Sequence, residues 1–129
     1  ESIRKIINND EFIKIINYIN NNDNIVNIAG HSSGGSKAII FGVYLAKLYK
    51  ENFFKIVTFG SPKIANSYYF SKIKSMKNID IISIQLMDDL VPILGLGRHE
   101  ENKSVKIYPT KIESNPYNAH RMIRYINNL

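Results

Sequence analysis

The chain has 129 residues, of which 44% are hydrophobic and 22% are charged. This length and composition fit one compact domain or part of one, and they exclude two full domains and a disordered chain. Cysteine is absent, which excludes a disulfide scaffold and a cysteine-based metal site. The net charge of +6 could attract anionic surfaces, but it is also typical of a solvated lysine-rich surface.

The first three predicted elements are helix, strand and helix. In residues 10–20, apolar side chains recur at steps of three and four residues and Asp10 can cap the first turn, which predicts an amphipathic helix. Residues 24–29 are rich in isoleucine and valine and end at Gly30, as expected of a buried strand. On a helix over residues 35–50, apolar side chains would cover most of the circumference, which predicts a largely buried helix.

The middle of the chain continues this alternation. Residues 54–59 predict a second strand that ends at the turn Gly60-Ser61-Pro62, and 65–76 predict a polar helix. The largely apolar run 79–86 predicts a third strand, which we expect to be covered on both faces.

The C-terminal part begins with a predicted long loop over 88–102, of a length that is usually functional. Polar and apolar residues then alternate over 103–108, as in an edge strand, and 116–128 predict one closing helix with Pro116 in its first turn. The order of the elements predicts an α/β fold, a mostly parallel sheet flanked by helices.

One motif suggests a nucleophile. Gly30-His31-Ser32-Ser33-Gly34 matches G-x-S-x-G where the first predicted strand turns into a helix, and chance gives about 0.03 such matches in a chain of this composition. We expect Gly30 and Gly34 to be required because the tight turn leaves no space for Cβ atoms. Ser32 would be the nucleophile, and the backbone N–H of Ser33 would stabilise an oxyanion. The alternative is a Gly/Ser-rich turn that binds phosphate, although no Gly-Lys-Ser/Thr sequence supports a Walker-type loop.

A serine nucleophile needs a histidine base. His31 lies beside Ser32 in the turn, so we interpret it as a structural residue that points away from Ser32. His99 lies in the polar loop, where a solvated surface role is expected. His120 opens a predicted apolar face with Ile123 and Ile126, and it is the best candidate for the base.

The acid of such a triad should follow the nucleophile and precede the histidine. Asp88 and Asp89 both stand at the end of the third predicted strand. Either carboxylate could hold the second N–H of the imidazole, and either could instead begin the loop or cap a turn.

Three stretches resemble class 3 lipases, the fungal-lipase-like branch of the α/β-hydrolase fold. Residues 28–38 are similar to the nucleophile elbow of that family, in which leucine usually stands at the position of Ser33. Residues 58–63 are similar to its Gly-Ser-Pro or Gly-Ala-Pro turn, and 89–92 (Asp-Leu-Val-Pro) to its acid segment. The resemblance assigns the acid to Asp89 and the base to His120, and it extends from about residue 10 to the C-terminus.

The resemblance also implies a domain organisation. Family members have an N-terminal half with earlier strands, a lid and the second oxyanion donor. The chain begins with Glu1 and with the helix before the elbow. We therefore interpret residues 1–129 as a single truncated domain, the C-terminal half of an α/β-hydrolase fold.

The implied activity is that of a carboxylic ester hydrolase, a lipase or esterase that forms an acyl-enzyme and cleaves lipid or small esters without a cofactor or a metal. The alternative is a non-catalytic lipase-like fragment that binds a membrane surface or a partner chain such as the missing half. Nucleic-acid binding ranks third, because Lys72, Lys74 and Lys77 lie in a predicted polar helix without a recognised motif. No apolar run long enough for a membrane span and no signal peptide is apparent, and the compartment stays open.

Overall fold

The computed structural model describes residues 9–20, 25–95 and 104–129. Four parallel strands form one sheet in the order β1-β2-β3-β4, which confirms the predicted α/β class. The elements, in chain order, are α2 (Asp10–Asn20), β1 (Ile25–His31), α3 (Ser33–Leu48), β2 (Phe53–Phe59), α4 (Ser67–Lys74), β3 (Ile79–Leu86), the 3₁₀ helix η1 (Val91–Ile93), β4 (Ser104–Ile107), α5 (Pro116–Ala119) and α6 (Met122–Asn128).

Most predicted boundaries agree with the structure to within two residues. Helix α2 and strand β3 have the predicted bounds. Strand β1 continues past Gly30, because its pairing with β2 extends to His31 opposite Phe59. Helix α3 begins at Ser33, two residues before the predicted start at Gly35. The first predicted residues of two strands, Asn24 and Lys103, lie outside the described residues.

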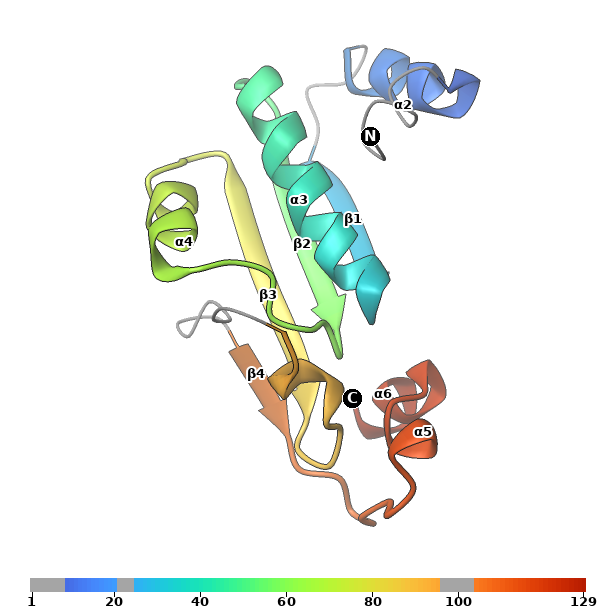
Figure 1. Ribbon diagram of the computed structural model, residues 1–129. Helices are drawn as coiled ribbons and strands as arrows, with labels where there is room; N and C mark the ends of the chain where they lie inside the picture. Colours follow the sequence, from blue (N-terminus) through green and yellow to red (C-terminus); the bar gives the residue numbers. More distant parts are fainter. Residues whose placement is uncertain (1–8, 21–24, 96–103) are drawn as a thin grey trace.

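One face of the sheet carries the main core. Helices α2, α3 and α4 pack on the same side of the strands, and α3 runs along β1 and β2 in Figure 1. The buried side chains of this layer are Phe12, Ile19, Ala38, Ile39, Val43, Leu45, Ala46, Phe54, Ile56, Phe70, Ile73 and Ile81. Burial of this apolar set fixes the sheet and α3 as one rigid unit.

The opposite face is covered only in part by the described helices. Tyr125 of α6 packs against Ile84 and Leu86 where the strands end. Where the strands begin, Ile25 is 52% exposed and Lys55 is also exposed. Cover on both faces was predicted for β3 alone, and every residue of that strand is buried or partly buried. Figure 1 shows α5 and α6 at this end of the sheet and α2 at the other.

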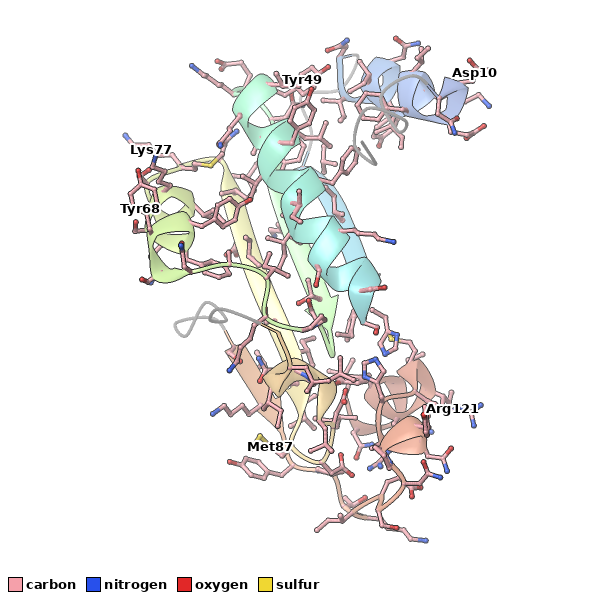
Figure 2. All side chains as sticks on the ribbon, in the orientation of Figure 1. Asp10, Tyr49, Tyr68, Lys77, Met87 and Arg121 are labelled. Atoms are coloured by element: carbon pink, nitrogen blue, oxygen red, sulfur yellow. The ribbon has the colours of Figure 1, made fainter. Side chains whose placement is uncertain are left out.

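The C-terminal helix differs from the prediction. The single helix predicted over 116–128 is wrong, because the chain breaks after α5 and restarts as α6, with Arg121 extended at ψ 137° between them. The predicted apolar face is also wrong: Ile123 and Ile126 are 51% and 57% exposed, whereas Tyr125 is fully buried. The break rotates α6 so that Tyr125 faces the sheet. Figure 2 labels Arg121 at this junction.

The predicted loop over 88–102 contains a short ordered turn. The backbone N–H of Asp89 donates to the carbonyl of Leu86 at 3.1 Å, and η1 follows with Pro92 buried. Residues 96–102, with His99 among them, lie outside the described residues.

Candidate active site

Ser32 stands at the junction of β1 and α3 in a conformation that residues other than glycine rarely adopt. Its backbone has φ 57° and ψ −131°, the only positive φ of a non-glycine residue in the described ranges. Two backbone hydrogen bonds hold it: its N–H donates to the carbonyl of Phe59 at 3.0 Å, and its carbonyl accepts from the N–H of Gly35 at 2.9 Å. The sharp turn expected of a nucleophile elbow is therefore present.

The glycines around Ser32 differ in whether the structure has space for a side chain at their position. A Cβ at Gly30 would lie 2.3 Å from the backbone oxygen of Gly34, so the end of β1 can approach α3 only without a side chain. At Gly34, by contrast, a Cβ would meet no atom within 4 Å, and the expectation that this glycine is required is wrong. The second tight position is Gly35, where a Cβ would lie 2.8 Å from Cβ of Ser61.

The structure brings together Ser32, His120 and Asp89. His120 Nδ1 lies 2.7 Å from Oδ2 of Asp89, and its Nε2 lies 2.7 Å from Oγ of Ser32. Because an ionised carboxylate only accepts hydrogen bonds, Nδ1 carries the proton and Nε2 is the acceptor for the Ser32 hydroxyl. The three residues come from three places: the β1–α3 junction, the turn after β3, and the junction of α5 with α6. All three meet where the strands end.

Asp89 is held by three donors in a buried environment. Its side chain is fully buried. Besides His120, the hydroxyl of Tyr125 donates to Oδ2 at 2.6 Å, and the backbone N–H of Val91 donates to Oδ1 at 2.9 Å. Since an unpaired buried carboxylate would be costly, these bonds stabilise its charge and fix its orientation.

Tyr125 was not identified from the sequence. Burial and its hydrogen bond to the Asp89 carboxylate raise the pKa of Tyr125 well above its ordinary value, so the phenol remains a donor. Its hydroxyl also accepts from the backbone N–H of Leu86 at 3.4 Å. The sequence signal is a tyrosine five positions after His120, which is recognisable only once the break between α5 and α6 is known.

Gly60 makes space for these groups. It has φ 56°, and a Cβ there would lie 2.7 Å from Oη of Tyr125, 2.8 Å from Oδ2 of Asp89 and 3.1 Å from Cε1 of His120. The Gly-Ser-Pro turn, predicted to end β2, therefore also leaves the volume in which the acid and the imidazole meet.

His31 is closer to the site than expected. Its ring stacks on the ring of His120, with centroids 4.6 Å apart and planes at 29°, and its Nε2 donates to the carbonyl oxygen of His120 at 2.7 Å. The prediction that His31 is a structural residue did not include these contacts with His120, because nothing near His31 in the sequence indicates them.

The neighbouring Asp88 does not contact His120. Its Oδ2 lies 2.9 Å from Nη2 of Arg124 and accepts from the backbone N–H of Glu113 at 2.9 Å. The two adjacent carboxylates therefore have separate partners, and only Asp89 faces the imidazole.

Two further residues named from the sequence are Ser33, which directly follows Ser32, and Lys72, which lies on another helix. Ser33 opens α3 with its side chain exposed, and Lys72 lies on α4 with Nζ 4.6 Å from the ring centre of Tyr68. Within the described ranges no group of three His, Cys, Asp or Glu residues could hold a metal ion. No helix there has both the length and the apolar character that crossing a bilayer requires.

The family model described as lipase (class 3) matches residues 4–98, roughly three quarters of the chain, and this range includes Ser32 and Asp89 but not His120. Among curated proteins none matches. A solved structure, the crystal structure of M37 lipase, aligns with 17% identity and a TM-score of 0.46, covering 53% of this chain and 21% of that chain. The chain thus spans about a fifth of that lipase. By the family match, the chain belongs to the class 3 lipases.

Proposed function

We propose that this chain is a serine hydrolase that cleaves carboxylic esters of lipids through an acyl-enzyme. The observation that supports this most directly is the continuous hydrogen-bonded series from Oγ of Ser32 through the His120 ring to the buried carboxylate of Asp89. Membership of a lipase family is independent support. Together they favour ester hydrolysis over a phosphate-binding turn.

Acylation would begin at Ser32. As Oγ attacks the carbonyl carbon of the ester, Nε2 of His120 accepts the hydroxyl proton, and Asp89 stabilises the resulting imidazolium. The carbonyl oxygen becomes an oxyanion that accepts from the backbone N–H of Ser33. The tetrahedral intermediate then expels the alkoxide, which takes the proton from His120 and leaves as the alcohol.

In deacylation, water would take the place of Ser32 as the attacking group. His120 accepts a proton from water while the water oxygen attacks the carbonyl carbon of the acyl-serine. Collapse of this second intermediate releases the carboxylic acid, and the proton on His120 returns to Oγ of Ser32. The enzyme is regenerated without a cofactor.

The backbone N–H of Ser33 is the oxyanion donor that we propose within this chain. Removal of one such donor typically lowers turnover by about 10²–10³-fold. Turnover should therefore depend strongly on how this donor and any second one are placed.

The test is labelling of Ser32 by a fluorophosphonate probe together with hydrolysis of a short-chain ester. Wild type should gain one probe per chain and release alcohol, Ser32→Ala should do neither, and Ser71→Ala on the exposed surface of α4 should behave as wild type. Equal activity in Ser32→Ala, or a folded wild type that neither labels nor hydrolyses, overturns the proposal. The second outcome would favour the alternative of a lipase-like chain that only binds a partner or a membrane.

A further inference from the structure

The end of helix α5 leaves a carbonyl that a side chain of β1 satisfies. In an unbroken helix the carbonyl of His120 would accept from the N–H of Arg124. Because the chain breaks after α5, the N–H of Arg124 donates to the carbonyl of Arg121 instead, at 2.9 Å. The carbonyl of His120 accepts from Nε2 of His31 at 2.7 Å. His31 therefore satisfies the backbone group that the break leaves open.

The ring of His31 makes a second contact with the same residue. It stacks on the His120 imidazole, with ring centroids 4.6 Å apart. It also contacts the Tyr125 ring edge-on, with centroids 6.0 Å apart. A ring held on one face cannot rotate freely, so the stack limits the orientations available to His120. Because a carbonyl only accepts, Nε2 of His31 must carry a proton, which excludes that nitrogen as a base for Ser32.

We propose that His31 is a positioning residue for His120, holding its main chain by a hydrogen bond and its ring by stacking. The dipeptide His31-Ser32 thus contacts His120 at three points: the carbonyl oxygen, the ring face and Nε2. The kinetic consequence rests on the proposed ester hydrolysis, whereas the positioning itself is a property of the folded chain.

The expected effect on catalysis follows from displacement of the base. His31 does not contact the reacting atoms, so its replacement leaves His120 present but less well held. A shift of about 1 Å in a catalytic group can cost about 10²-fold in rate, and the loss of one hydrogen bond allows a smaller shift. We therefore expect kcat to fall about tenfold with KM for a soluble ester unchanged.

The experiment separates the two contacts. His31→Phe keeps a stacking ring and removes the donor, whereas His31→Gln keeps an N–H donor and removes the ring. We expect His31→Phe to lower kcat and the rate of fluorophosphonate labelling in parallel, and His31→Gln, which loses only the stack, to lower both by a smaller factor. If His31→Phe loses its folded circular dichroism spectrum, His31→Ala replaces it as the variant without a donor.

A second readout does not depend on activity. The Nδ1–H proton of His120, hydrogen-bonded to Asp89, should give a low-field NMR signal that shifts or broadens in His31→Phe and recovers in His31→Gln. Wild-type kcat and an unchanged signal in the donor-free variant overturn the positioning role. A wild type that neither labels nor turns over ends the proposed function instead, and the NMR signal then still tests His31.

Discussion

Ser32 and His120 meet at 2.7 Å, yet the chain holds them by different means. Ser32 is fixed by backbone: hydrogen bonds to neighbouring main chain, and the close approach of Gly30 to the first turn of α3. His120 lies between two short helices whose contacts are made by side chains, notably Tyr125 with Asp89 and Arg124 with Asp88. Ser32 is therefore positioned mainly by main-chain contacts, and His120 mainly by side-chain contacts.

The family match includes the segment with Ser32 and leaves out the segment with His120. The matched range ends at residue 98, so it includes Ser32 and Asp89 but not the segment with His120. A turn built from glycines leaves a short motif, whereas a segment held by side chains leaves scattered residues. Variants should therefore affect the two regions differently.

The largest effect is expected at Asp89, which connects the two regions. In Asp89→Asn, the amide can present its N–H₂ to Nδ1 of His120, so the imidazole adopts the wrong tautomer for accepting from Ser32. We expect ester turnover to fall by about 10⁴-fold while the chain remains folded. Steady-state hydrolysis and circular dichroism measure this.

Asp88→Asn is the matched control. It weakens the contact with Arg124 but leaves the hydrogen bonds of His120 intact, so turnover should stay within about tenfold of wild type, as for the loss of one modest interaction. If Asp88→Asn lost as much activity as Asp89→Asn, the assignment of the acid to Asp89 would be wrong.

The next largest effect is expected at the turn that holds Ser32. Gly30→Ala places a Cβ against the backbone of α3 and should lower the free energy of unfolding by about 1–3 kcal/mol or more. Gly34→Ala meets open space and should change it by less than about 1 kcal/mol. Urea unfolding of both variants measures the difference. Equal values would show that the elbow is not as tight as its geometry indicates.

A smaller effect is expected where one side-chain hydrogen bond is removed from the region around His120. Tyr125→Phe keeps the buried ring but removes the donor to Asp89, which should cost about 1–3 kcal/mol of stability at neutral pH. Tyr117→Phe, whose hydroxyl is on a residue 87% exposed on α5, should cost almost nothing. Thermal or urea unfolding of the pair compares them.

The pH dependence sharpens this comparison. Because the pKa of Tyr125 is raised above 10.0 in the folded chain, the unfolded phenol ionises first as the pH rises. The stabilisation from Tyr125 is thus fully present below pH 10 and is lost above it, so the gap between wild type and Tyr125→Phe should narrow at alkaline pH. A gap that widened there would contradict a protonated, buried donor.

The sequence predicted the parts of this molecule that depend on local pattern. The strands and α3 follow from apolar runs, and the elbow follows from its motif. The residues alone left Asp88 and Asp89 equivalent, and only the resemblance chose Asp89. The distinction depends on Arg124, which lies far along the chain and contacts Asp88.

The sequence failed where tertiary contacts determine the outcome. No glycine or proline marks the break after His120, so one helix was the simpler prediction. The tightness at Gly35 depends on Ser61, and its neighbour Gly34 lacks such a contact. His31 was placed in the correct turn, but its partner is the C-terminal segment.

The backbone of Ser32 has one consequence for engineering. A non-glycine residue in such a conformation costs about 1–3 kcal/mol, which glycine would largely avoid. Ser32→Gly should therefore melt at a higher temperature than wild type while losing its hydroxyl. Directed evolution for thermostability alone would favour Ser32→Gly, which lacks the proposed nucleophile. Any such screen of this chain therefore needs a turnover assay as well.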